Sequence, residues 1–220
     1  MVSDSVFIRK TAKSDSLLGL ASQKGGVGKT TLAGHLAVMA ESKGAGPVAL
    51  IDTDPQGSLS SWWNERRAET PAFASVDIAS LADHLSLLEK AGVNLAIIDT
   101  PPAVTETIRK VLAVADMVLI PTRPSPHDLR AVGSTVELVE AVGKRMVFVI
   151  NGAAQRARIT GEAAIALSQH GTVAPVTLYQ RTDFAASMID GRTAQEIDPS
   201  SRTAGEVEAL WNYVSTQLRK

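Results

Sequence analysis

Short runs of apolar residues recur along the chain, and each run is bounded by residues that favour turns. The runs are nearly continuous in apolar character, which is typical of parallel strands that are covered on both faces. We therefore expect buried strands at 17–22, 47–52, 93–99, 116–120 and 146–151, with a weaker one at 172–178.

The segments between these runs carry apolar residues three or four positions apart, which is the spacing of a helix with one buried face. This spacing predicts helices at 29–43, 78–91, 104–114, 126–142, 159–170 and 204–219. The last helix has a single apolar stripe, formed by Val207, Leu210, Trp211, Val214 and Leu218. Strands that alternate with helices predict an α/β fold, a mostly parallel twisted sheet with helices on both faces.

The length of 220 residues suits a single domain of this kind, which we assign to 17–220. Residues 1–16 contain Val6, Phe7 and Ile8 among charged residues but lack the apolar core of a signal peptide, so we expect a flexible N-terminal tail. The absence of cysteine excludes disulfides and thiolate-bound iron–sulfur clusters and fits a cytoplasmic location. No apolar run is long enough to span a membrane. With a net charge of −1, binding to nucleic acid requires a local basic patch.

The stretch at 24–31, Lys-Gly-Gly-Val-Gly-Lys-Thr-Thr, has the composition of a loop that binds phosphate groups. Its three glycines allow successive backbone N–H groups to turn inward, because no Cβ blocks the conformations required. A predicted strand precedes the loop and a predicted helix follows it, which is the context that such a loop needs. The predicted nucleotide-binding residues are Lys24, Gly25, Gly26, Val27, Gly28, Lys29, Thr30 and Thr31.

The loop departs from the common P-loop template at two positions. Gln23 stands where the template has glycine, and Lys24 adds a second lysine at the mouth of the loop. Lys29 is expected to reach the outer phosphates of ATP, and Thr30 to bind Mg²⁺ through its hydroxyl. Because Lys24 has no role within this scheme, we expect it to reach a nucleotide bound to a second copy of the chain, as an arginine finger supplied in trans does.

Two carboxylates follow the second predicted strand, in the sequence Asp52-Thr53-Asp54-Pro55-Gln56-Gly57. Carboxylates at the end of a buried strand are costly in a core and favourable beside a bound cation. Asp-Pro and Gln-Gly also favour turns, so the alternative interpretation is an Asx-turn or a helix N-cap. Beside a phosphate-binding loop we favour catalysis, in which Asp54 orients or deprotonates the attacking water and Asp52 takes part.

A third carboxylate, Asp99, ends the aliphatic run at 95–98. P-loop nucleoside triphosphatases use an aspartate in this position to hold Mg²⁺, usually through its water shell. The side chains predicted to hold Mg²⁺, in part through water, are Thr30, Asp54 and Asp99. Because ligands of parallel sheets bind at the carboxyl ends of the strands, we expect these groups at one edge of the sheet.

Two further residues are candidates for contact with the base of the nucleotide. Asn151 follows the apolar run at 146–150, where its amide can read a base edge, and an ordinary turn residue is the alternative. Pro175 is expected after another short strand, where its ring can pack on the base.

These motifs together resemble the ParA/MinD family of deviant Walker ATPases. The resemblance begins at 24–31, 52–57 and 97–102 and continues through 120–129, 190–192 and 196–199. Within the family the chain most resembles the small ParF-like partition ATPases, because Asp-Thr-Asp-Pro-Gln is followed by Ser58-Leu59-Ser60-Ser61-Trp62. The longer ParA proteins carry an N-terminal helix-turn-helix domain, for which 1–16 leaves no room.

The resemblance implies a protein that forms a sandwich dimer on ATP, with each Lys24 contacting the partner's nucleotide. It implies that this dimer binds DNA without sequence preference and that a ParB-like or centromere-binding protein stimulates its slow ATP hydrolysis. Such a protein segregates plasmid or chromosomal DNA and associates with the nucleoid in its ATP state. In this scheme Asp54 activates water, Thr30 and Asp99 hold Mg²⁺, and Asp128 is a dimer or switch contact.

Binding to DNA without sequence preference requires basic residues gathered on one face. The candidates in the C-terminal half are Arg156, Arg158, Arg181, Arg192, Arg202, Arg219 and Lys220. The alternative interpretation for each of them is an ordinary solvated surface charge.

Three other functions share the same loop. A MinD-like ATPase that cycles on a membrane needs a terminal helix with a basic polar face, whereas 204–219 carries Glu206 and Glu208 and a stripe suited to packing. A biosynthetic ligase needs a small-molecule pocket that no motif marks. An ATPase that positions an organelle or a protein cluster uses the same machinery as plasmid partition, so the sequence leaves these two open.

Overall fold

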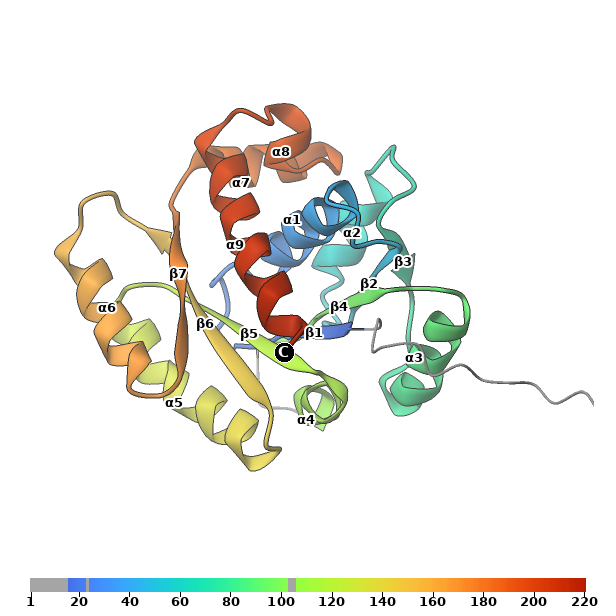
Figure 1. The fold of residues 1–220 in the computed structure, drawn as a ribbon, viewed down its shortest axis with the longest axis horizontal. Helices are drawn as coiled ribbons and strands as arrows, with labels where there is room; N and C mark the ends of the chain where they lie inside the picture. The colour runs from blue at the N-terminus through green and yellow to red at the C-terminus, as the bar shows by residue number, and fades with distance from the viewer. Residues whose placement is uncertain (1–15, 23, 103–105) are drawn as a thin grey trace, which may run out of the picture.

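Seven parallel strands form the centre of the molecule, in a computed structural model that describes residues 16–22, 24–102 and 106–220. The strands are β1 (Ser16–Leu20), β2 (Val48–Asp52), β3 (Ala72–Ala74), β4 (Leu95–Asp99), β5 (Met117–Thr122), β6 (Arg145–Ala153) and β7 (Thr172–Tyr179). Their order across the sheet is β3-β2-β4-β1-β5-β6-β7, and each neighbouring pair is parallel (Figure 1). The predicted single-domain α/β fold is confirmed.

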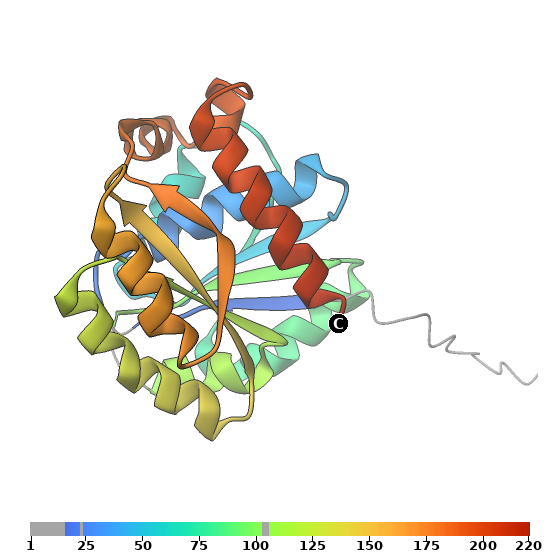
Figure 2. The same cartoon turned by 60° about the vertical axis from the view of Figure 1, so that its left-hand side comes forward.

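Helices cover both faces of the sheet (Figures 1 and 2). One face carries α1 (Lys29–Ser42), α2 (Ser58–Asn64) and α9 (Arg202–Leu218). The other face carries α3 (Leu81–Lys90), α4 (Glu106–Val114), α5 (Pro126–Ala141) and α6 (Arg158–Ser168). Between β7 and α9 lie α7 (Thr182–Ser187), the 3₁₀ turn η2 (Met188–Asp190) and α8 (Ala194–Ile197). In the part of the chain that the structure describes, no helix has both the length and the apolar character needed to cross a bilayer.

The core has an apolar layer on each side of the sheet, because successive residues of a strand point to opposite faces. Leu18 and Leu20 of β1 pack in the layer with α1 and α9, whereas Leu17 packs in the layer with α3 and α4. The stripe predicted for the last helix is confirmed. Its buried members are Val207, Leu210, Trp211 and Val214. Leu218 is partly buried and packs at the edge of the same layer.

The strand order explains why the predicted motifs meet. From β1 the chain passes through α1 to β2 on one side, while β4 leads through α4 to β5 on the other side of β1. Such a reversal opens a crevice at the carboxyl ends of the strands, where ligands of parallel sheets bind. The loops after β1, β2 and β4 carry the three predicted motifs, so all three lie at this edge of the sheet.

Some elements differ from the predicted pattern. The apolar pattern did not predict α2, β3, α7, η2 or α8, and the helix predicted at 78–91 is divided into a 3₁₀ turn, η1 (Ile78–Ser80), and α3. These pieces are short, and α2 buries only Leu59 and Trp62, which is too few residues to establish a helical period. At the N-terminus β1 already includes Ser16, while the rest of the predicted tail, 1–15, lies outside the described residues.

Pro175 lies inside β7, and the prediction that it follows a shorter strand is wrong. A proline lacks the N–H group that a central strand needs for its ladder. Here β7 is an edge strand, and its register with β6 shifts between the pairs that flank Pro175. The strand therefore continues past the proline, and its carboxyl end lies at Tyr179.

Candidate functional site

The glycine-rich loop connects β1 to the first turn of α1. Gly26 and Gly28 have φ angles of 74° and 90°, which side chains with a Cβ rarely adopt. At Gly28 a Cβ would also lie 2.5 Å from Nδ2 of Asn151. The first N–H groups of a helix have no partner within the helix and attract anions. The loop and the start of α1 therefore have backbone donors suited to a phosphate group, while Gln23 lies outside the described residues.

Lys29, the first residue of α1, is only 7% exposed. Its Nζ donates a hydrogen bond of 3.2 Å to the carbonyl oxygen of Ser22. Burial lowers the pKa of Lys29, and the carboxylates of Asp99 and Asp54 oppose this shift. A desolvated ammonium group gains strongly from a bound anion, so Lys29 is suited to bind phosphate.

Asp99 ends β4 and is 1% exposed. Its Oδ2 accepts a hydrogen bond of 2.5 Å from Oγ1 of Thr30, while its Oδ1 is buried without a hydrogen-bond partner among the described residues. Burial raises the pKa of Asp99 to about 7, although the Thr30 hydroxyl favours the ionised form. A buried carboxylate oxygen without a partner, next to a hydroxyl, fits a hard cation such as Mg²⁺.

Protein ligands alone do not complete such a cation site. Within the described ranges, no group of three or more His, Cys, Asp and Glu side chains is arranged to hold a metal. Mg²⁺ keeps several waters and is commonly held by one or two protein groups together with substrate phosphates. Thr30 and Asp99 fit this arrangement, and Asp54 is the third predicted participant.

The two carboxylates after β2 have different surroundings. Asp52 accepts a 3.0 Å hydrogen bond from the N–H of Asp54 on Oδ1. On Oδ2 it accepts bonds from the N–H and hydroxyl of Ser60, at 2.9 and 3.1 Å. Asp52 thus closes the turn at 52–54 and caps the first turn of α2, which is the alternative to its predicted catalytic role. Asp54 is half-buried and lines the cleft beside the loop, where its predicted role requires it to be.

A cleft of about 770 Å³ contains most of these groups. Its lining from the predicted motifs consists of Gly25, Gly26, Gly28, Lys29, Thr30, Thr31 and Asp54. Other parts of its lining were not predicted as site residues, and they include Trp62, Glu65, Arg123, Met188 and Ile189. The sequence contains one weak signal for Trp62 as a site residue. It lies four residues after Ser58 on a short polar helix, where a tryptophan needs a buried partner.

Lys24 lies at the rim of this site and is paired within its own chain. Its Nζ is 4.0 Å from Oδ1 of Asp128, and its side chain is 41% exposed. Asp128 is buried in the first turn of α5, where its N–H donates to the hydroxyl of the N-cap residue Ser125 at 3.1 Å. The two residues predicted to act at a dimer contact are therefore neighbours, and the trans role of Lys24 stays a prediction.

The two residues predicted to contact the base lie apart from one another. Asn151 donates from Nδ2 to the carbonyl oxygen of Val27 at 2.6 Å, which attaches β6 to the loop. It also lines a second cavity of about 170 Å³ next to Gly28, together with residues at the end of β7 such as Tyr179. Pro175 lines neither this cavity nor the main cleft. Its predicted base contact is not supported, because the strand continues beyond it.

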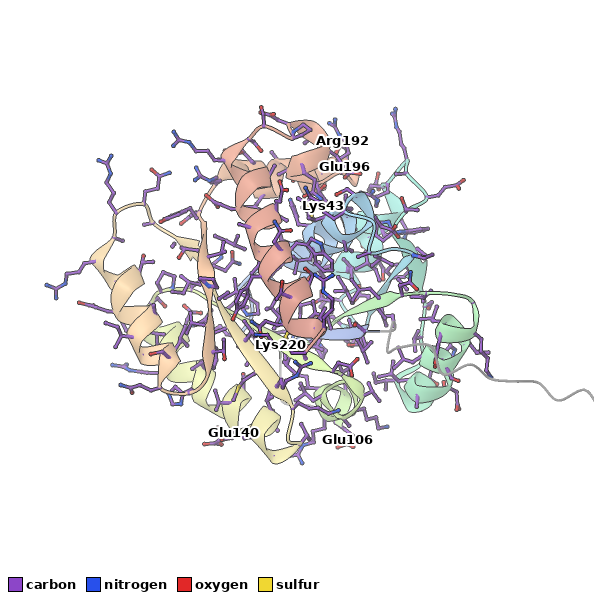
Figure 3. The ribbon with its side chains drawn as sticks, viewed as in Figure 1. Lys43, Glu106, Glu140, Arg192, Glu196 and Lys220 are labelled. Atoms are coloured by element: carbon purple, nitrogen blue, oxygen red, sulfur yellow. The ribbon has the colours of Figure 1, made fainter. Side chains whose placement is uncertain are left out.

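The predicted DNA-contacting residues fall into two groups. Three of them are neutralised by carboxylates, in the pairs Arg158–Glu162, Arg181–Glu206 and Arg192–Asp190. The other four are exposed and pair with no carboxylate in the described part of the chain, namely Arg156, Arg202, Arg219 and Lys220. Arg192 and Lys220 lie toward opposite ends of α9 (Figure 3). The unpaired residues are the stronger candidates for phosphate contacts.

The sequence of the chain is similar to those of known nucleotide-binding proteins. A family model described as the CobQ/CobB/MinD/ParA nucleotide binding domain matches residues 18–193. The chain is 28% identical over 207 residues to the maintenance of carboxysome distribution protein A of Halothiobacillus neapolitanus, covering 90% of this chain and 95% of that protein. It is 25% identical over 233 residues to the chromosome-partitioning ATPase Soj of Thermus thermophilus, covering 92% and 82%.

Among solved structures, the fold is similar to that of the septum site-determining protein MinD from Pyrococcus horikoshii in complex with Mg-ADP. The TM-score is 0.77 at 16% identity, and the match covers 92% of this chain and 97% of that one. At this identity the likeness concerns the fold alone.

Proposed function

The chain belongs to the CobQ/CobB/MinD/ParA nucleotide-binding family and is an ATPase of the ParA/MinD type, and we propose that ATP binding makes it dimerise and hydrolysis resets it. One observation carries the proposal. Lys29, a buried lysine, and Thr30 line one cleft. The Thr30 hydroxyl also donates to the buried carboxylate of Asp99, whose other oxygen has no hydrogen-bond partner among the described residues.

Each of these groups has a distinct task in phosphoryl transfer. The loop amides and Lys29 bind the phosphates, and Thr30 and Asp99 would hold Mg²⁺. When bound, Mg²⁺ supplies positive charge that stabilises the charge on the transferred phosphoryl group. Asp54 accepts a hydrogen bond from the N–H of Gln56 at 3.0 Å and lines the same cleft, where it orients the attacking water.

The base occupies the cavity of about 170 Å³ beside the loop. Asn151 lines that cavity while attached to Val27, so it both supports the loop and lies within reach of a base edge. Tyr179 at the end of β7 offers the flat surface that was expected of Pro175.

Lys24 distinguishes a dimerisation switch from an ordinary ATPase. In one chain it lies beside Asp128, and in the ATP dimer it leaves that carboxylate for the partner's nucleotide. The expected result for Lys24→Ala is loss of ATP-dependent dimerisation with nucleotide binding retained, measured by light scattering and by binding of a fluorescent ATP analogue. A Lys90→Ala variant is the control, because Lys90 is an exposed residue at the end of α3. Normal dimerisation of Lys24→Ala would show that the trans role is wrong.

The ATP dimer binds DNA without sequence preference, which would place it on the nucleoid. The support is the set of exposed basic residues that pair with no carboxylate among the described residues, among them Arg202 and Arg219. Arg219→Glu is expected to weaken ATP-dependent DNA binding and to flatten its salt dependence. Each phosphate contact that is lost lowers the number of counterions that binding releases from the DNA. Lys90→Glu provides a charge-matched control on α3. Unchanged binding in both Arg202→Glu and Arg219→Glu would remove these two residues from the proposal.

A protein partner of the ParB type is proposed to stimulate hydrolysis during partition of plasmid or chromosomal DNA. The similarity to the carboxysome distribution protein favours a second candidate, an ATPase that positions a protein assembly with the same cycle. A DNA-binding partner encoded by an adjacent gene would support partition, and a partner that binds a protein assembly would support positioning. A membrane-cycling function has less support, because the apolar stripe of α9 is buried against the sheet.

A further inference from the structure

One wall of the nucleotide cleft is formed by two segments that are far apart in the sequence. The first is α2, which contributes Trp62 to the lining of the cleft. The second is the turn from η2 to α8, which contributes Met188 and Ile189. Neither segment belongs to the motifs that bind phosphate, yet both border the space that a nucleotide would fill.

Arg66 connects the two segments. Its side chain is only 2% exposed and forms a two-bond ion pair with Glu196 of α8, at 2.8 and 3.1 Å. The same guanidinium donates to the carbonyl oxygens of Gly191 and Thr70, at 2.6 and 2.8 Å. Buried bidentate pairs of this kind fix orientation as well as distance. Arg66 therefore attaches the end of α2 rigidly to the turn before α8.

Trp62 completes the connection. Its Nε1 donates to the carbonyl oxygen of Arg192 at 3.1 Å, and the guanidinium of Arg66 lies 4.9 Å from the centre of its ring. On α1 its ring packs against Gly34, where a Cβ would come within 3.1 Å of the indole. Gly191 has a φ of 74°, and a Cβ there would lie 2.3 Å from the backbone nitrogen of Arg66. These close approaches leave α2 a single position between α1 and the turn.

The position of α2 is coupled to Asp54 through one carboxylate. Asp52 accepts the N–H of Ser60, in the first turn of α2, on one oxygen and the N–H of Asp54 on the other. A shift of α2 would therefore move Asp52 and the backbone of Asp54 with it. A displacement of about 1 Å in a reacting group can lower a rate about a hundredfold.

We propose that Arg66 and Trp62 are positioning residues for ATP hydrolysis, acting on Asp54 through α2 and Asp52. Neither side chain needs to contact the phosphates for this role. The inference rests on the proposed ATPase cycle and adds to it a structural requirement at Glu196 and Arg192, which lie near one another in Figure 3. Its consequence is that hydrolysis and nucleotide binding depend on different walls of the same cleft.

The test is the Arg66→Lys variant, which keeps the charge but cannot supply the four hydrogen bonds. The expected result is a kcat that falls about ten- to a hundredfold, with the Kd of a non-hydrolysable ATP analogue changed less than about threefold. Both are measured at a temperature where circular dichroism shows the variant fully folded. Arg67→Lys is the matched control, because Arg67 is exposed and forms no ion pair in the described ranges.

Trp62→Phe provides a second, independent variant, since it keeps an aromatic ring but removes the bond to Arg192 and part of the contact with Gly34. It is expected to lower kcat about threefold to tenfold with the same unchanged Kd. An unchanged kcat in both folded variants would overturn the inference, and so would a Kd that weakens as much as kcat falls. If the wild-type chain itself hydrolyses no ATP, the proposed function fails instead.

Discussion

The two sides of the nucleotide cleft are built in different ways. On one side, consecutive residues at 24–31 form the phosphate loop, and glycines with positive φ give it its shape. On the other side, the wall is formed by α2, η2 and α8. It depends on hydrogen bonds from Trp62 and Arg66 to the turn at 191–196, and the partners in these bonds are separated by 125 or 130 positions in the sequence. In the proposed cycle the loop side supplies chemistry, and the wall supplies position. Substitutions on the two sides should therefore change different measurements.

The largest effect is expected on the loop side, for Lys29→Ala. Loss of the buried ammonium that is proposed to bind the phosphates should weaken ATP binding by about a thousandfold, or about 4 kcal/mol. The fold should change little, because burial already lowers the pKa of Lys29 and its charge is costly where it lies. Titration with a fluorescent ATP analogue measures the first quantity and thermal unfolding the second. ATP binding that stays within tenfold of the wild type would contradict the assignment of Lys29.

On the wall side, Gly191→Ala should show the opposite pattern. A Cβ at this position meets the backbone of Arg66 at 2.3 Å and also sits at a φ of 74°, so the free energy of unfolding should fall by about 3 kcal/mol. Chemical denaturation measures this loss, and turnover of the folded fraction should fall while ATP affinity holds. Gly44→Ala is the matched control, since Gly44 has a similar φ of 75° but an added Cβ would meet no atom of the described residues within 4 Å. Equal losses in both variants would attribute the effect to backbone strain alone.

The same contrast separates the features that could be predicted from the sequence from those that could not. The loop, Asp54 and Asp99 could be proposed as site residues because their signals are local: glycines at fixed spacing, and carboxylates that follow apolar runs. Parallel strands then bring these signals to one edge without any further information. The strands other than β3 were predicted within a few residues, because strands buried on both faces are nearly continuous in apolar character.

The wall could not be predicted, because its partners are specified only by the folded structure. Nothing near Arg66 in the sequence indicates that Glu196 will neutralise it. Likewise, two carboxylates one residue apart look equivalent until Ser60 shows that Asp52 caps a turn. Pro175 was misplaced for a related reason, since a proline ends a central strand but not an edge strand with a shifted register.

His35 connects the two sides of the cleft through hydrogen bonds to Thr31 and Ala194, and its protonation should weaken this connection. It is fully buried on α1, where Nδ1 lies 2.8 Å from the carbonyl oxygen of Thr31 and Nε2 3.1 Å from the N–H of Ala194. The carbonyl must accept and the N–H must donate, so the ring is neutral with its proton on Nδ1. Burial lowers the pKa of His35 to about 4, below its unfolded value of about 6.5.

Because the unfolded chain binds this proton first, the contribution of His35 is complete above pH 6.5 and decreases as pH falls toward 4. Between pH 7 and 5 the wild type should lose about 2 kcal/mol of unfolding free energy relative to His35→Gln. Taking the difference between the two chains cancels Asp99, whose pKa is raised to about 7 by burial and which acts with the opposite sign. Denaturant titrations of both proteins at the two pH values measure it. A difference that does not change with pH would show that His35 is not buried in its neutral form.

The smallest effect is expected at Ser60, where the wall meets the catalytic loop. Ser60→Ala removes the 3.1 Å hydroxyl bond to Asp52 but keeps the 2.9 Å bond from the backbone N–H, so the joint is weakened and not broken. A partly exposed hydrogen bond contributes about 0.5–1 kcal/mol, which corresponds to a two- to fivefold lower kcat at unchanged ATP affinity. Single-turnover hydrolysis measures it, with Ser86→Ala on α3 as the control, because Ser86 is exposed and is not part of the cleft lining. A loss as large as that of Arg66→Lys would mean that the Ser60 hydroxyl acts on the nucleotide directly. If Ser60→Ala lowers kcat in the wild type but not in Trp62→Phe, the two residues position Asp54 through the same set of contacts.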